Sequence, residues 1–168
     1  METMKVVKKI VVTMILMVIL SPGIVNAQQQ GDWALGASMI YGHEDLIENF
    51  GIGVKGQYNV SNPVRLEANY MDFFKKNYVK IWSFSLNIHY LFHVTENSTL
   101  YPIAGIGYLE AENTYYSKSK YGSDYALYLG GGFDYKLAPS LVGNIELKYE
   151  GAEEWNRLLL SAGITYRF

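Results

Sequence analysis

Apolar residues recur at every second position along most of the chain beyond about residue 30. The clearest stretch is 157–168, where Leu, Ala, Ile, Tyr and Phe alternate with mostly polar or small residues. A period of two puts the apolar side chains on one face of a β-strand and the others on the opposite face. The pattern therefore predicts a two-faced strand at the end of the chain.

The same alternation recurs in seven more stretches, so the sequence predicts eight strands. The other seven are 33–41, 50–58, 64–70, 78–92, 101–109, 125–135 and 141–150. The stretch 101–109 is the least regular, because Ile103 and Leu109 fall on the face opposite Ala104, Ile106 and Tyr108. Beyond the first 27 residues, no run approaches the 18 or so apolar residues that indicate a membrane-spanning helix.

The predicted connections alternate in length. Turn-forming residues dominate the short ones, which are 59–63, 93–99 and 136–140. The longer ones, 42–49, 111–124 and 151–156, carry most of the loop charge, whereas 73–77 is short for its set. An even number of strands, with short turns at one end and long loops at the other, is typical of membrane-spanning up-and-down barrels.

Aromatic residues on the apolar faces gather near the strand ends. At the end with short turns they are Trp33, Tyr58, Tyr90, Phe92, Phe133, Tyr135, Tyr166 and Phe168; at the end with long loops they are Tyr41, Phe50, Tyr70, Trp82, Tyr108, Tyr125 and Tyr149. Aromatic belts at two lipid–water interfaces flank the apolar band of a transmembrane barrel. We therefore predict an all-β fold, an eight-stranded antiparallel transmembrane β-barrel with its apolar faces outside.

The first 27 residues form a separate unit. They hold Lys5, Lys8 and Lys9, then the mostly apolar run Ile10–Leu20, then a Ser-Pro-Gly break and Val-Asn-Ala. This is the three-part pattern of a secretory signal peptide, and the apolar run is about half the ~20 residues that a membrane anchor needs. The predicted division is a cleaved signal peptide over 1–27 and a barrel domain over 28–168.

Composition excludes several classes of protein. There is no cysteine, and 14 basic residues face 16 acidic ones. A disulfide scaffold, a thiolate metal site and a basic nucleic-acid-binding protein are therefore not expected. The three histidines, His43, His89 and His93, lack metal-ligand spacing, so neither a metal nor a cofactor is predicted.

Charged residues on the polar faces are expected to line the lumen, because charge facing lipid is costly. The predicted lumen network is Lys55, Arg65, Glu67, Asp134, Glu146, Lys148 and Arg167. A barrel of eight strands is only just wide enough for its own side chains. We therefore expect ion pairs and hydrogen bonds to fill the lumen, and a narrow porin for small solutes is the alternative.

The signal peptide, the eight strands and the ending Ile164-Thr165-Tyr166-Arg167-Phe168 together resemble the small eight-stranded outer-membrane β-barrel proteins, the OmpX-like and OmpA-like barrels. In that family, a terminal phenylalanine preceded by alternating apolar residues is the signal for the barrel-assembly machinery. The residues that match this signal are Leu160, Ala162, Ile164, Tyr166 and Phe168. The resemblance implies a monomer in outer-membrane lipid, with both termini periplasmic and a structural or surface-interaction role without catalysis.

Two other functions have sequence features in their favour. Some barrels of this size modify lipid A with a histidine and a serine, and here His89 with Ser85 or Ser83 is the candidate pair. The tripeptide Gly31-Asp32-Trp33 is similar to the opening of the lipocalins, soluble ligand-binding barrels. A lipocalin interior is apolar, however, whereas the interior predicted here is charged.

The long connection 111–124 carries the last candidate feature, a contact surface for protein or glycan. Its residues are Tyr115, Tyr116, Lys118, Lys120 and Tyr121. Aromatics beside lysines on an exposed loop can form such a surface. The simpler interpretation, which we favour, is a pair of strands extended above the membrane with a solvated tip.

Overall fold

The computed structural model describes residues 30–43, 48–76, 78–113, 119–153 and 156–168. The predicted signal peptide, 1–27, lies outside these residues. The strands are β1 (Trp33–His43), β2 (Glu48–Ser61), β3 (Val64–Lys76), β4 (Val79–Tyr90), β5 (Phe92–His93), β6 (Ser98–Asn113), β7 (Ser119–Ala138), β8 (Leu141–Gly151) and β9 (Asn156–Arg167). No helix among the described residues has the length and apolar character to cross a membrane.

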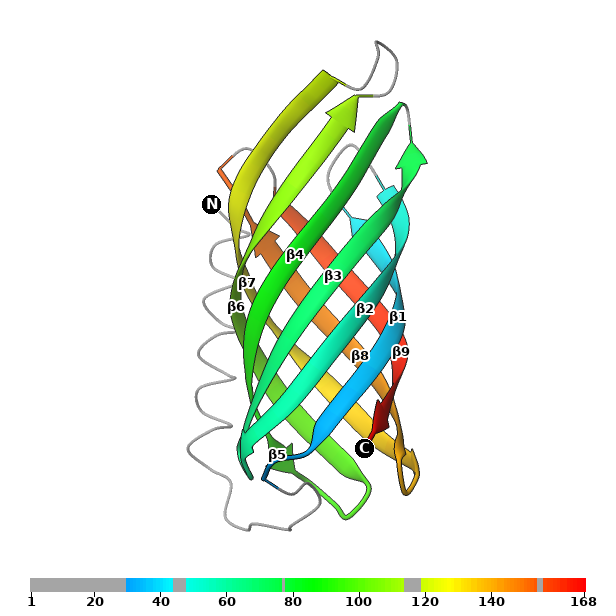
Figure 1. Cartoon of the computed structure of the whole chain (residues 1–168), viewed down its shortest axis with the longest axis vertical. Helices are drawn as coiled ribbons and strands as arrows, with labels where there is room; N and C mark the ends of the chain where they lie inside the picture. The colour runs from blue at the N-terminus through cyan, green and yellow to red at the C-terminus, as the bar shows by residue number, and fades with distance from the viewer. Residues whose placement is uncertain (1–29, 44–47, 77, 114–118, 154–155) are drawn as a thin grey trace, which may run out of the picture.

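The strands form one closed antiparallel barrel (Figure 1). Each long strand pairs with the next along the chain, and β1 pairs with β9 to close the sheet. The short strand β5 continues β4 beyond Leu91, and both pair with β6. Leu91 lies between the two strands, and its N–H donates to the carbonyl oxygen of Pro63, next to β3, 2.7 Å away. The wall therefore has eight strands, and the predicted fold is confirmed.

The barrel has its large apolar side chains on the outside. Leu35, Ile106 and Leu127 are about 60% exposed, and they alternate with neighbours that point into the lumen. The two irregular residues of the fifth predicted strand, Ile103 and Leu109, lie inside and are almost fully buried. An apolar exterior that alternates with lumen-facing residues is the arrangement of a barrel surrounded by lipid.

The predicted connections 111–124 and 73–77 were largely wrong, because the structure continues both strand pairs through them. The pairs Glu112–Lys120 and Lys76–Val79 extend the β6–β7 and β3–β4 ladders. These extensions lie above the apolar band, where both faces of a strand can be polar and the period of two disappears. The wall is consequently tallest at β6 and β7 (Figure 1).

Candidate functional site

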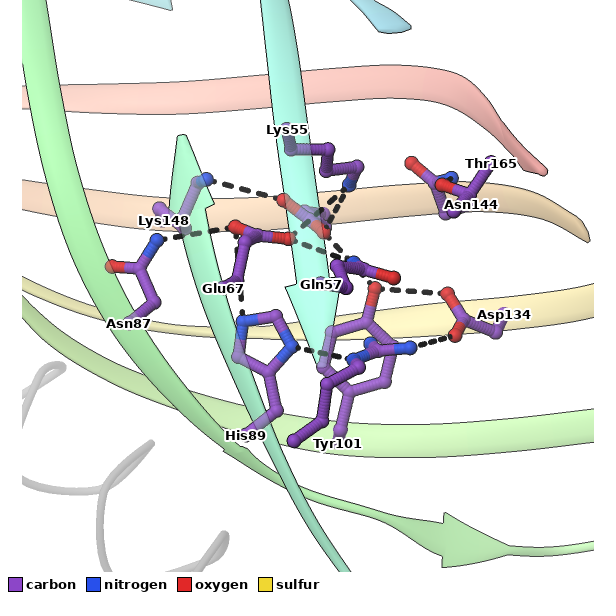
Figure 2. A network of polar contacts seen from close by, with 12 residues as sticks. Lys55, Gln57, Glu67, Asn87, His89, Tyr101, Asp134, Asn144, Lys148 and Thr165 are labelled. Atoms are coloured by element: carbon purple, nitrogen blue, oxygen red, sulfur yellow. Dashed lines mark hydrogen bonds and ion pairs between the residues drawn. The ribbon is translucent and has the colours of Figure 1, made fainter. Parts of the chain in front are cut away.

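A network of buried charges lies inside the lumen (Figure 2). It is nearer the end with short turns, because Arg65 lies at the start of β3 and Asp134 near the end of β7. Glu146 on β8 lies at its centre. One carboxylate oxygen accepts a hydrogen bond from Lys55 Nζ on β2 at 2.6 Å, and the other lies 3.1 Å from Lys148 Nζ. The hydroxyl of Tyr101 on β6 is 3.1 Å from the same carboxylate. Glu146 thus joins three strands.

Glu67 on β3 is the second carboxylate of the network. It accepts hydrogen bonds from Gln57 Nε2 at 2.8 Å and from Asn87 Nδ2 at 3.1 Å. Lys55 Nζ is 3.7 Å away, and His89 Nε2 is 3.9 Å away. Lys55 therefore lies between two carboxylates that come from opposite parts of the sheet.

Arg65 and Asp134 form the third ion pair, nearer the end with short turns. Arg65 Nη1 lies 2.7 Å from Asp134 Oδ2, and Arg65 Nε donates to His89 Nδ1 at 3.1 Å. The guanidinium also stacks over the ring of Tyr101, 4.5 Å from its centroid. Because the Tyr101 hydroxyl is 3.0 Å from Asp134 and 3.1 Å from Glu146, this tyrosine links the two ion-pair groups.

Charge is balanced within the network. The six charged residues are between 1% and 4% exposed, and they comprise three cations and three anions: Lys55, Arg65, Lys148, Glu67, Asp134 and Glu146. Burying a charge is costly unless an opposite charge and hydrogen bonds replace its hydration. In this arrangement each ion faces an opposite charge within 4 Å.

Arg167, the seventh residue of the predicted network, lies at the mouth of the lumen and is only half-buried. With Asp32, Ala34, Gln57 and Asn59 it lines a cavity of about 10 Å³, which also reaches Arg65. Such a volume holds about one water molecule. The structure therefore brings six of the seven residues together and leaves Arg167 at the edge.

A second, apolar layer fills the lumen towards the end with long loops, and sequence reasoning missed it. Its buried members are Ile40, Met71, Phe73, Ile81, Leu109, Ala111, Ala126, Tyr128 and Leu159. The prediction of a lumen filled only by polar groups was thus incomplete. Met71 and Phe73 continue the lumen face of Arg65 and Glu67 at a spacing of two, so extending that alternation past residue 70 could have found them.

A buried ion pair lies within the apolar layer. Arg157 Nε donates to Glu150 Oε1 at 2.7 Å, and the Tyr128 hydroxyl donates to Glu150 Oε2 at 2.7 Å. The guanidinium of Arg157 stacks over the ring of Phe73 at 4.5 Å. The sequence prediction omitted both charges of this pair.

The residues considered for lipid A chemistry lie inside the closed lumen. His89, Ser83 and Ser85 are fully buried, so a lipid on the outer wall does not reach them. The hydrogen-bond partner of Ser85 Oγ is Asn87, and that of His89 Nδ1 is Arg65. Within the part of the chain that the structure describes, no group of three acidic or histidine side chains could hold a metal ion.

The remaining predicted residues lie on the outer wall or beyond it. Leu160, Ala162, Ile164 and Tyr166 share the outer face of β9, and Phe168 follows with its N–H donating to the Trp33 carbonyl at 3.0 Å. In the predicted contact loop, Lys120 and Tyr121 belong to β7. Tyr115, Tyr116 and Lys118 lie outside the described residues.

Comparison with known proteins supports an outer-membrane barrel. The family described as "Outer membrane protein beta-barrel domain" matches residues 14–168. No curated protein is similar in sequence at a significant level.

Solved structures share the fold at low sequence identity. The N-terminal barrel domain of Pseudomonas aeruginosa OprF is 18% identical, with a TM-score of 0.68, covering 84% of this chain and 100% of that one. Neisserial surface protein A is 18% identical, with a TM-score of 0.68 and coverages of 82% and 96%. The attachment invasion locus protein Ail of Yersinia pestis is 18% identical, with a TM-score of 0.61 and coverages of 83% and 100%.

Proposed function

Because this chain belongs to the outer membrane protein beta-barrel domain family, we propose that it acts as a sealed, non-enzymatic barrel with a structural or surface-interaction role. The observation that carries the proposal is the double filling of the lumen. Balanced ion pairs occupy one part, and a packed apolar layer occupies the part nearer the long loops. The soluble lipocalin alternative is not consistent with the family or with the apolar exterior.

The two layers oppose ion flow for different physical reasons. An ion passing the polar part would have to displace side chains that already neutralise one another. An ion passing the apolar layer would lose its hydration among Phe73, Leu109 and Leu159, which are at most 1% exposed. Either part of the lumen alone would hinder the passage of ions, so a narrow porin is the less favoured hypothesis.

The proposal includes an orientation and a route of assembly. The end with short turns, where Trp33 and Phe168 meet, would face the periplasm, and the tall β6–β7 extension would face outward. The outward apolar residues of β9, together with Phe168, would be read by the barrel-assembly machinery. The barrel would be a monomer, because its sheet is closed and leaves no strand edge to share within the membrane.

Single-channel recording in planar bilayers tests the sealed lumen. We expect no stable conductance from the chain lacking residues 1–27, whereas a water-filled porin would give steps on the order of a nanosiemens. The double substitution Phe73→Ser and Leu159→Ser opens the apolar layer and serves as a sensitised comparison. Heat-modifiable mobility on a gel establishes first that each sample is a folded barrel.

Stable porin-like steps from the unsubstituted barrel would overturn the proposal and favour the narrow porin. Silence from the unsubstituted barrel, with or without brief openings of the double variant, supports it.

A further inference from the structure

The hairpin that joins β3 to β4 rises above the ends of β1 and β2, on the side with long loops (Figure 1). Lys76 pairs with Val79, so the loop of the hairpin has only two residues. Two large side chains near this loop, Phe74 and Tyr78, are 56% and 54% exposed. Both residues lie beyond the aromatic belt on the same two strands, so the hairpin extends past the membrane interface.

Tyr78 has a backbone conformation that residues with a bulky side chain rarely adopt. Its φ is 66°, and among the described residues other than glycine no second one has a positive φ. The second position of a two-residue hairpin loop often requires a positive φ, and glycine is the usual residue there. A tyrosine at this position costs stability, so we expect its ring to have a role beyond the formation of the turn.

The hairpin is the basic connection at the end with long loops. From residue 72 to residue 80 it has three lysines and one aspartate. The connections 42–49 and 151–156 have acidic residues but no lysine or arginine, and 111–124 has two residues of each sign. An anionic partner approaching this end would therefore be attracted to the β3–β4 hairpin and repelled by the two acidic connections.

Lysine and aromatic side chains lie together in the hairpin. Lys75 Nζ is 5.4 Å from the centre of the Tyr78 ring. Lys80 Nζ lies 3.3 Å from the carboxylate of Asp72, so the excess positive charge belongs to residues 75 and 76. An exposed ring offers an apolar face to the C–H groups of a sugar, and an ammonium group pairs with a sulfate or carboxylate. The combination fits an acidic polysaccharide, in which sugar rings and anionic groups recur along one chain.

We propose that the β3–β4 hairpin binds an acidic polysaccharide outside the cell, through Phe74, Lys75 and Tyr78. The proposal rests on the outward orientation proposed above. It goes further in assigning the surface-interaction role to one hairpin and to one class of partner.

Binding of dextran sulfate to the folded barrel lacking residues 1–27, in nanodiscs of a zwitterionic phospholipid, tests the site. We expect dextran sulfate to bind, and neutral dextran and polyglutamate to bind about tenfold more weakly or worse. Tyr78→Gly should weaken binding by about tenfold or more. It should leave the urea midpoint of unfolding unchanged or higher, because glycine tolerates a positive φ. A role in folding alone would lower this midpoint instead.

Lys75→Gln should weaken the binding of dextran sulfate severalfold, because it removes the charge beside the Tyr78 ring. Lys136→Gln is the matched control. It removes the same charge from the opposite end of the barrel, near the end of β7, and should bind like the unsubstituted protein.

Several results would overturn the proposal. They are equal binding of polyglutamate, unchanged binding by Tyr78→Gly, and an equal loss of binding in Lys136→Gln. Loss of binding in nanodiscs that also contain lipopolysaccharide would overturn it too, because the hairpin would then hold the glycolipid of its own membrane.

The orientation of the hairpin is tested separately. The chain has no cysteine, so Lys75→Cys can be labelled on intact cells by a maleimide attached to a polymer too large to cross the outer membrane. Absence of labelling would overturn the outward orientation and the proposal with it, whereas labelling without dextran sulfate binding would overturn the polysaccharide site alone. Heat-modifiable mobility shows that each variant is a folded barrel.

Discussion

Glu146 is the residue on which most of the lumen network converges. Its carboxylate contacts Lys55, Lys148 and the hydroxyl of Tyr101, and all of these groups are buried. A buried ion pair contributes little net stability compared with an apolar pair, but removing one partner leaves an uncompensated charge in a medium of low polarity. Without the Glu146 charge the network would hold one unbalanced positive charge next to Lys55 and Lys148, because Glu67 still lies 3.7 Å from Lys55.

We expect Glu146→Gln to lower the free energy of unfolding by about 3–5 kcal/mol. Urea unfolding in phospholipid vesicles, followed by the gel-mobility shift, measures it. Asp72→Asn is the matched control, because the pair between Asp72 and Lys80 is partly exposed at 3.3 Å and should cost at most about 1 kcal/mol. Equal losses for the two variants would show that the lumen charges are not held in a low-dielectric interior.

At the scale of the strand, the sequence best predicted which residues face the lumen in the segments that cross the lipid. Lipid requires an apolar face, and the lumen could then take the charges, so Glu67 and Lys148 were predicted to face inward from the alternation alone. Around Met71 and Ile81 the inward side chains are apolar whereas the outward neighbours Asp72 and Lys80 are charged, so the expected contrast between the faces fails and the inner layer was missed. Above the membrane both faces can be polar, so the continuation of β6 and β7 was also missed.

At Gly130 on β7, close contact with the backbone of β8 leaves no room for a larger residue. A Cβ added to Gly130 on β7 would lie 2.2 Å from the carbonyl oxygen of Leu147 and 2.8 Å from Lys148 Cα, so β7 and β8 would have to separate. We expect Gly130→Ala to cost about 1–3 kcal/mol or more in the same unfolding assay. At Gly122, in the same strand, an added Cβ meets nothing within 4 Å, and Gly122→Ala should change stability by no more than about 0.5 kcal/mol. Matching effects at the two glycines would contradict the packing described for β7 and β8.

At the scale of the whole molecule, the barrel has an apolar outer wall, and its buried charges lie in the lumen beside the apolar layer. A soluble barrel has the reverse arrangement. The change in stability caused by one charge on the outer wall therefore distinguishes a membrane barrel from a soluble one. Leu147 is 48% exposed and lies in the aliphatic band, whereas Tyr166 lies in the aromatic belt near the end of β9.

We expect Leu147→Arg to destabilise the folded barrel in vesicles by about 2–4 kcal/mol, and Tyr166→Arg by about 0–1 kcal/mol. The difference arises because a charge costs most at the middle of the bilayer and little near an interface. Unfolding titrations of both variants in the same vesicles provide the comparison. A harmless arginine at position 147 would mean that this surface faces water.

The ladder between β1 and β9 joins the first strand of the barrel to the last, and Phe168 donates its N–H to Trp33. The sheet therefore closes on itself, and the two ends of the barrel domain lie next to each other at the β1–β9 pair. A short linker could join the end of β9 to the start of β1. New termini could then be placed in another connection, such as the turn between Ala138 and Leu141. A circular permutant of this kind should keep all eight strand pairings while changing which strand is synthesised last, so it would separate the stability of the barrel from the order in which its strands are made.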